Sequence, residues 1–258
     1  MTRLFHIADL HFGAESDRLV AAFEEACAAE NPGLLVAAGD FTQAGRRREF
    51  AAARAMFDRI GLPAVGAPGN HDVPVYALGQ RALTPWRRFH SQLGEQVIPA
   101  YRSDALHVES LHTARRAQFR PDWSLGRVSG RHLEPVIERL AASAAGTRIL
   151  TCHHPLLAPG GLKGRARTHR GDRAADLAAE ACDLVLTGHL HETFVLPAPD
   201  EDKSCWFVGT GTTFSDRTRD EAASFNRIDI EPERILITRM AADDGKTFKP
   251  GRTWELER

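Results

Sequence analysis

The stretch Leu4-Phe5-His6-Ile7-Ala8-Asp9-Leu10-His11 decides how this chain folds and where its chemistry lies. A short, almost continuous apolar run is typical of a strand buried on both faces. Asp9 and His11 follow directly, and side chains two residues apart in an extended chain point the same way. We therefore expect a buried strand that delivers a carboxylate and an imidazole to one point at its carboxyl end.

The same alternation of short apolar runs and amphipathic stretches continues to residue 191. Buried strands are predicted at residues 4–8, 34–38, 64–67, 106–110, 149–152 and 184–187. Helices are predicted at residues 16–30, 50–60, 84–93, 132–145 and 172–181. Strands that alternate with helices predict an α/β fold.

The texture changes after residue 192 to strand-like pieces separated by turns. These pieces are residues 193–196, 205–208, 224–230 and 234–240. They predict hairpins that complete a second sheet packed on the sheet of the strand–helix units. A length of 258 residues fits one large domain, and we expect residues 1–258 to form a single domain.

Four further clusters of metal-ligand type stand at the ends of predicted strands. They are Gly39-Asp40, Gly69-Asn70-His71-Asp72, His153-His154-Pro155 and Gly188-His189-Leu190-His191. Open α/β sheets place their ligand-binding loops at the carboxyl ends of the strands. Carboxylate and amide oxygens mixed with imidazoles suit divalent metals.

Each cluster alone also fits a purely structural explanation. Asp9 and His11 fit a cap beside a core histidine, and residues 69–72 fit a tight turn with Asn or Gly at positive φ. Pro155 explains a strand that ends at residues 153–154. Five such clusters, all at strand ends, favour one shared metal site.

The net charge and the cysteine spacing limit the classes of binding partner and the cellular compartment that we expect. The formal net charge of -1 argues against a surface that tracks an extended nucleic acid, although residues 163–173 are a candidate basic contact with substrate. The four cysteines lack Cys-x-x-Cys spacing, which predicts free thiols in a reduced compartment. No apolar run could span a bilayer, and the first strand leaves no room for a signal peptide. We expect a cytoplasmic protein.

The ordered set D-x-H, G-D, G-N-H-D, H and G-H-x-H resembles the calcineurin-like metallophosphoesterase superfamily. The resemblance implies a four-layer αββα sandwich with two mixed sheets and two divalent metal ions, such as Mn, Fe or Zn. It implies one metal on Asp9, His11 and His191, a second on Asn70, His153 and His189, and Asp40 between them. A hydroxide bridging the metals would attack the phosphorus.

The resemblance also implies roles around these ligands. His71 would lie over the substrate and stabilise the transition state or protonate the leaving oxygen, and Asp72 would orient it through the other ring nitrogen. His153 is preferred to His154 because the ligand of the family stands two residues before the proline, and His154 is the second candidate. Arg217 is a candidate phosphate contact.

Residues 39–43 and 153–155 are similar to the class III cyclic nucleotide phosphodiesterases. That similarity implies hydrolysis of a small phosphodiester, with cyclic AMP as the leading substrate. Relatives in the superfamily cleave glycerophosphodiesters or nucleotide-lipid pyrophosphates. For a lipid substrate, a helix around Trp86 with Leu83, Phe89 and Leu93 in register is a candidate membrane flap.

Two other readings compete with an enzyme of this fold. A retromer subunit keeps the fold as a non-catalytic scaffold after losing key histidines, whereas every ligand position is filled here. A (β/α)8 metallohydrolase barrel would need repeated strand–helix units that the chain lacks after residue 192. The oligomeric state is open.

Overall fold

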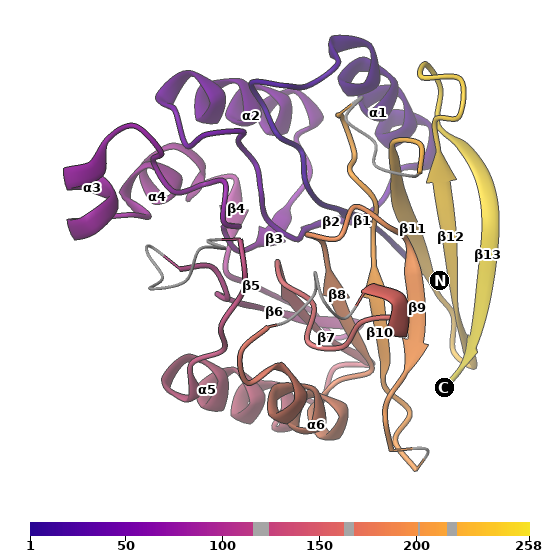
Figure 1. Cartoon of the computed structure of the whole chain (residues 1–258). Helices are drawn as coiled ribbons and strands as arrows, with labels where there is room; N and C mark the ends of the chain where they lie inside the picture. Colours follow the sequence, from indigo (N-terminus) through magenta and orange to yellow (C-terminus); the bar gives the residue numbers. More distant parts are fainter. Residues whose placement is uncertain (116–123, 163–167, 201, 216–220) are drawn as a thin grey trace.

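The chain folds into two mixed β-sheets covered by helices on their outer faces (Figure 1). The computed structural model describes residues 1–115, 124–162, 168–200, 202–215 and 221–258. The strands are β1 Thr2–Ile7, β2 Leu34–Ala37, β3 Ala64–Gly66, β4 Val97–Ile98, β5 Ala100–Arg102, β6 Leu106–Leu111, β7 Thr147–Cys152, β8 Leu184–Thr187, β9 Phe194–Pro197, β10 Trp206–Gly209, β11 Ser224–Ile230, β12 Arg234–Ala241 and β13 Lys249–Glu257. The helices are α1 Asp17–Glu30, α2 Arg47–Ile60, α3 Leu78–Leu83, α4 Arg87–Leu93, α5 Gly130–Ala141 and α6 Gly171–Ala181, with a 3-10 turn at Gly160–Leu162.

Both sheets combine a parallel centre with antiparallel additions. The seven-stranded sheet has the order β13-β12-β11-β1-β2-β3-β4, in which β1 to β4 are parallel and β11 runs antiparallel to β1. The six-stranded sheet has the order β5-β6-β7-β8-β10-β9, with β6, β7, β8 and β10 parallel. The strand–helix half of the chain therefore contributes to both sheets.

Alternation along the strands sorts the apolar side chains into three cores. In β1, Leu4 belongs to the cluster between the sheets, whereas Phe5 belongs to the cluster under α1 and α2. In β7, Ile149 joins the core between the sheets and Leu150 joins the cluster under α5 and α6. Successive strand residues point to opposite faces, so the central strands are apolar throughout.

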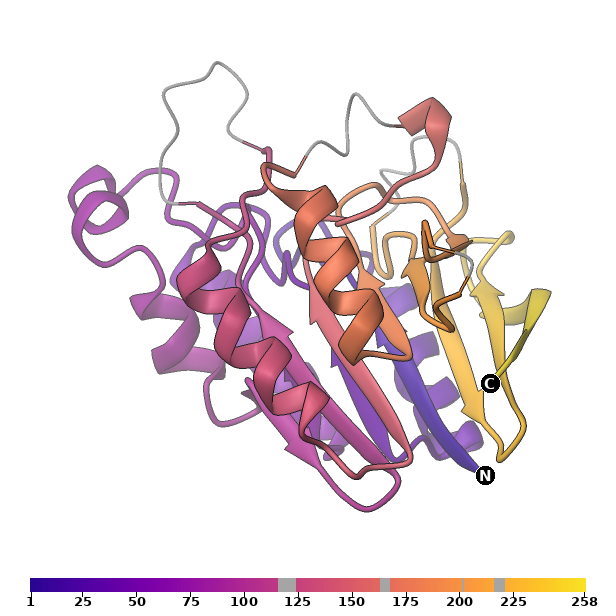
Figure 2. The ribbon, with the colours of Figure 1, turned by 90° about the horizontal axis from the view of Figure 1, so that it is seen from below.

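The layers are thus helix, sheet, sheet, helix. Figure 2 shows α5 and α6 side by side on one outer face, with the two sheets and then the remaining helices behind them. Phe23 of α1 is fully buried against Phe5 and Phe225, at ring-centroid distances of 6.1 and 5.1 Å. The predicted four-layer αββα sandwich is confirmed, and the all-parallel (β/α)8 barrel is excluded by the antiparallel neighbours of β1 and β10.

Several details differ from the sequence-based expectations. The C-terminal hairpins do not all complete the second sheet, since β11, β12 and β13 extend the first sheet from β1. The helix expected at residues 84–93 begins only at Arg87, because Pro85 disfavours helical geometry in the residue before it. β13 and α3 were not predicted. In the described part of the chain, no helix is long and apolar enough to cross a membrane. The single-domain assignment of residues 1–258 stays a prediction.

Candidate metal centre

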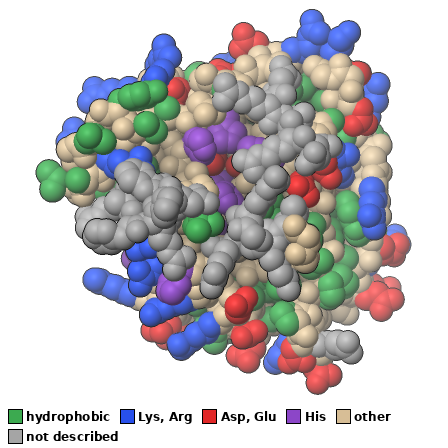
Figure 3. Space-filling view, in the orientation of Figure 1, with side chains coloured by type: hydrophobic (Ala, Val, Ile, Leu, Met, Phe, Trp, Pro, Cys, Tyr) green, Lys and Arg blue, Asp and Glu red, His purple; other side chains and the backbone are tan. Residues whose placement is uncertain are grey.

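The carboxyl ends of strands from both sheets meet at one edge of the sandwich. β1, β2 and β3 lead into Asp9, Asp40 and Asn70, and β7 and β8 lead into His153 and His189. Figure 3 shows histidine side chains gathered beside acidic ones near the middle of this face. Segments that are up to 182 residues apart in sequence are brought together by the parallel register of the central strands.

Asp9, His11 and His191 form the first group of possible ligands. Nε2 of His191 lies 3.1 Å from Oδ1 of Asp9, and Nε2 of His11 lies 3.7 Å from the same oxygen. The two Nε2 atoms are 3.4 Å apart. One ligand atom from each residue lies within 4.8 Å of the others, which is the spacing that a single cation can span.

His153 is the centre of the second group. Its Nε2 lies 3.2 Å from Oδ2 of Asp40 and 3.1 Å from Oδ1 of Asn70. Its ring centroid is 5.2 Å from that of His189. Nδ1 of His153 donates to the carbonyl oxygen of Ala38 at 2.8 Å, so that Nε2 faces the acidic side chains. A backbone carbonyl on the second ring nitrogen is the usual way in which a protein orients a metal-binding imidazole.

Asp40 lies between the two groups. It is grouped with Asp9 and His153 on one side, and with His11 and His71 on the other. Its Oδ1 accepts a hydrogen bond from the backbone N–H of His71 at 2.8 Å. Asp40 is therefore placed between the His11 side and the His153 side of the cluster.

The backbone is strained where these side chains emerge. Seven non-glycine residues have positive φ in the described part of the chain, and five of them are predicted ligands: Asp9 (52°), His11 (48°), Asp40 (54°), His189 (71°) and His191 (61°). Such conformations cost roughly 1–3 kcal/mol each and persist where the surroundings hold them. Here the N–H of Asp9 donates to the Gly39 carbonyl at 3.0 Å, and the N–H of His189 donates to Oδ2 of Asp9 at 2.8 Å.

Close packing behind the ligands requires glycine at two of the motif positions. A Cβ on Gly69 would lie 2.1 Å from Oδ1 of Asp40, and a Cβ on Gly39, which has a φ of 85°, would lie 2.8 Å from Cβ of His153. No side chain fits at either distance. These glycines therefore allow the loops after β2, β3 and β7 to touch one another.

The charges of the group suit a divalent cation. Burial alone would raise the pKa of Asp9, but the neighbouring His191 lowers it to about 2. Burial lowers the pKa values of His11 and His189 to about 4, so both imidazoles are neutral at pH 7. Burial would also lower the pKa of His153, but Asp40 raises it to about 9. Ionised carboxylates and neutral imidazoles are the forms that bind metals, and a cation would displace the proton of His153.

His71 and Asp72 lie beside this group but do not form the expected pair. Nδ1 of His71 donates to the carbonyl oxygen of Gln43 at 2.7 Å, and its ring stands edge-on to His11 at 4.8 Å. The Asp72 carboxylate is fully buried beneath the loop and accepts hydrogen bonds from the backbone N–H groups of Phe41, Thr42 and Gly69 and from the Thr42 hydroxyl.

The expected hydrogen bond from His71 to Asp72 is therefore wrong. Asp72 lies under the backbone and joins the loop of Asp40 to the loop of Asn70, whereas the ring of His71 lies beside His11. Burial and the nearby Asp40 raise the pKa of Asp72 to about 7. A backbone carbonyl at Gln43 leaves no signal in a sequence, so its role as the partner of His71 was missed.

His154 has both ring nitrogens engaged elsewhere. Nε2 donates to the carbonyl oxygen of Ser124 at 2.7 Å, and Nδ1 accepts from the hydroxyl of Thr113 at 2.9 Å. The ring is fully buried and packs 4.6 Å from that of His189. This geometry favours His153 as the ligand and gives His154 the task of holding the segment at residues 124–126 against β7.

Part of the predicted substrate contact cannot be placed. Arg217, Lys163, Arg165 and Arg167 lie outside the described residues. Arg170 is described and precedes α6 with a φ of 62°.

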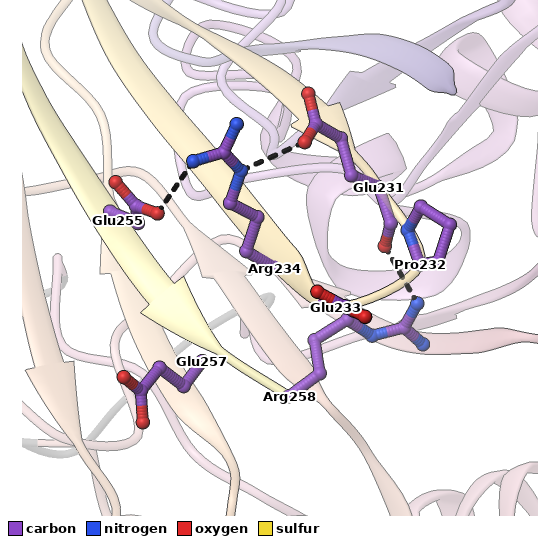
Figure 4. Close-up of a pocket in the computed structure, with 7 residues that line it drawn as sticks. All are labelled: Glu231, Pro232, Glu233, Arg234, Glu255, Glu257 and Arg258. Carbon is purple, nitrogen blue, oxygen red and sulfur yellow. Dashed lines mark hydrogen bonds and ion pairs between the residues drawn. The ribbon is translucent and has the colours of Figure 1, made fainter.

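A separate surface hollow of about 690 Å³ lies at the other end of the seven-stranded sheet, around the β11–β12 turn (Figure 4). Its Arg234 pairs with Glu231 and Glu255, each at 2.8 Å, and none of the predicted site residues lines it.

Comparison with known proteins agrees with the fold and gives the family. The family model for calcineurin-like phosphoesterases matches residues 2–193, so the chain belongs to this family, which is a group of metal-dependent phosphoric ester hydrolases. A curated relative from Synechococcus sp. (strain ATCC 27144 / PCC 6301 / SAUG 1402/1), named a probable cyclic nucleotide phosphodiesterase, is 27% identical over 168 residues. The match covers 64% of this chain and 60% of the relative.

Solved structures with the same fold include an enzyme and a sorting protein. The purple acid phosphatase PPD1 from yellow lupin (Lupinus luteus) seeds superposes with a TM-score of 0.68 at 14% identity, over 100% of this chain and 54% of that one. Vacuolar Protein Sorting 29 from Cryptosporidium parvum superposes with a TM-score of 0.52 at 16% identity, over 100% of this chain and 98% of that one. At these identities the likeness concerns the fold alone.

Proposed function

We propose that this protein is a dinuclear metal-dependent phosphodiesterase that hydrolyses a small phosphodiester, with a cyclic nucleotide such as cyclic AMP as the leading substrate. The observation that carries the proposal is the convergence of carboxylate, amide and imidazole groups on Asp40 from strand ends of both sheets. Asp9, His11 and His191 would hold one ion, Asn70, His153 and His189 would hold the other, and Asp40 would contact both.

Two divalent ions in this position would polarise a phosphate and supply a hydroxide nucleophile at neutral pH. The chain itself orients the groups around them. Nδ1–H of His71 is tied to the Gln43 carbonyl, so Nε2 is the nitrogen left to face the leaving oxygen, to which the imidazolium form of His71 would donate a proton. Asp72 keeps the two loops of Asp40 and Asn70 in register.

The substrate class rests on similarity to a relative. The Synechococcus relative is named for cyclic nucleotides, which supports a phosphodiester over a monoester. Hydrolysis of a nucleotide-lipid pyrophosphate or a glycerophosphodiester is the second candidate, favoured by the exposed apolar side chains of Leu78 and Leu83 on the segment beside the site. A cytoplasmic location is part of the same proposal.

A scaffold without activity is the competing proposal from another class, and Vacuolar Protein Sorting 29 has the same fold. All seven predicted ligand positions and His71 carry competent side chains here, which supports catalysis.

Purified protein should hydrolyse bis-p-nitrophenyl phosphate with Mn, Fe, Co or Zn, and a screen over cyclic nucleotides, glycerophosphodiesters, nucleotide-lipid pyrophosphates and monoesters should show a diester preference. Asp40→Ala should lose bound metal and turnover, whereas His71→Ala should keep the metal and slow the chemical step about 10²–10⁴-fold. His132→Ala, at an exposed position on α5, is the control that should change neither. Turnover absent with every metal would refute catalysis, and a monoester preference would refute the substrate class.

A further inference from the structure

We propose that the segment formed by residues 75–83 docks on the surface of an anionic lipid bilayer. Four of its side chains are exposed: Val75 (44%), Tyr76 (73%), Leu78 (70%) and Leu83 (82%). Together with Met1, they are the exposed large hydrophobic side chains of the residues that the structure describes. Scattered single apolar residues are normal on a surface, but four within nine residues form a patch that needs an apolar contact.

The apolar patch stands out from the body of the molecule. α3 buries none of its residues, whereas the following α4 buries Phe89 and Leu93 in the core under α1 and α2. The ring of Phe89 lies 5.4 Å from that of Phe41. The membrane flap expected around Trp86 is therefore corrected, because α4 is anchored in the core and the exposed apolar side chains belong to α3 and the loop before it. Figure 1 shows α3 at the left rim of the molecule, outside α4.

The charge around the patch selects an anionic partner. Residues 73–94 contain three arginines, Arg81, Arg87 and Arg88, and no aspartate or glutamate. The guanidinium of Arg46 lies over the ring of Tyr76, 4.7 Å from its centroid, and Arg47 beside it is exposed. Cationic side chains around exposed leucine and tyrosine are the composition that binds the interface of anionic membranes.

The size of the patch favours a bilayer over a protein. A stable protein interface uses about 20–30 residues on each side. Four apolar side chains, two on the six-residue helix α3 and two on the loop before it, fall well short of that. Insertion of a few apolar groups into a lipid surface, assisted by nearby cations, requires no such area.

The patch and the proposed catalytic histidine, His71, are both hydrogen-bonded to the loop at residues 43–45. The N–H of Val75 donates to the Ala44 carbonyl at 3.3 Å, and Nη1 of Arg88 donates to the Gly45 carbonyl at 2.6 Å. Gln43, the residue before Ala44, accepts a hydrogen bond from His71 through its carbonyl oxygen. The hydrophobic groups over α3 and the histidines share one face of the molecule (Figure 3), so docking would place the proposed site beside the lipid surface.

The inference goes beyond the proposed function, because lipid binding requires neither metal nor turnover. It is tested by sedimentation of the whole protein with vesicles of phosphatidylcholine alone or mixed with phosphatidylglycerol. We expect binding to the anionic vesicles that weakens as salt is raised. Leu78→Ser with Leu83→Ser should weaken it at least about a hundredfold, because two leucines that would insert into the lipid are lost.

Matched charge reversals separate the electrostatic contribution. Arg87→Glu should weaken binding at least about fivefold, from the attraction of one arginine to an anionic surface. Arg252→Glu, exposed on β13 at the opposite edge of the seven-stranded sheet, should leave binding unchanged. The double serine variant should keep wild-type turnover of bis-p-nitrophenyl phosphate without vesicles, so failure of catalysis and failure of docking remain distinguishable.

Three results would overturn the proposal. One is the lack of binding to anionic vesicles, and another is equal binding to phosphatidylcholine alone. The third is a concentration-dependent dimer in light scattering that disappears in the double serine variant while vesicles are not bound, since the patch would then join two copies of the chain.

Discussion

A methyl group added at Gly69 should disable the proposed metal centre without replacing any of its ligands. In Gly69→Ala the new Cβ would lie 2.1 Å from Oδ1 and 2.5 Å from the backbone nitrogen of Asp40. The contact must open to about 3 Å or more, so the loop of Asp40 has to move by about 1 Å. Displacements of this size cost about a hundredfold in rate when they misplace catalytic groups. The overpacking itself should destabilise the fold by about 1–3 kcal/mol.

The assay pairs metal affinity with turnover. Calorimetric titration with Mn should show at least a tenfold loss of affinity for Gly69→Ala, and hydrolysis of bis-p-nitrophenyl phosphate should fall about a hundredfold. Gly160→Ala is the matched control, because no atom lies within 4 Å of its added Cβ. Wild-type metal affinity and turnover in a folded Gly69→Ala protein would refute the close contact between the two loops.

Three further predictions concern stability and metal content. For protein kept in metal at about a hundred times the Kd, removal of the metal by a chelator should lower the free energy of unfolding by about 2.7 kcal/mol and lower Tm by roughly 5–10 °C in calorimetry. An unchanged Tm would contradict a bound ion. His154→Ala should lose roughly 2–4 kcal/mol of stability but keep the full metal content by elemental analysis, and loss of one ion would make His154 a ligand. Burial would raise the pKa of Glu109, but hydrogen bonds from Arg139, His107 and Arg102 lower it from 4.5 to about 2. Its stabilisation is therefore present above pH 4.5 and lost as the pH falls toward 2, so the Tm difference between wild type and Glu109→Gln should be largest at neutral pH and narrow over that range.

The central strands and the candidate site could be predicted from the sequence because both depend on the order of apolar and polar residues within short segments. The apolar runs that end at residues 8, 38 and 152 correspond to β1, β2 and β7, because a strand that is buried on both faces consists mainly of apolar residues. The candidate ligands could be proposed because each follows such a run closely. Parallel strands then bring those ends to one edge, which makes five remote motifs into neighbours.

The remaining features depend on contacts that leave no local pattern. β13 is polar and mostly exposed, and only pairing with β12 makes it a strand. Asp72 was assigned to His71 from adjacency alone, but burial turned its carboxylate toward the backbone of Thr42. Residues 163–167 and 216–220 lie outside the described residues, so the substrate contacts proposed there stay predictions.

The candidate ligands are divided between the two sheets. Asp9, Asp40 and Asn70 follow strands of the seven-stranded sheet, and His153 and His189 follow strands of the six-stranded sheet. An ion held by both sets would tie the two halves of the sandwich at one edge, so their separation would require the ion to leave first. Metal loading should then slow unfolding and amide hydrogen exchange at the ends of β1 and β7 more than it raises the protection of distant β13. The edge of the sandwich that carries the candidate metal site would then also control the rate at which the protein unfolds.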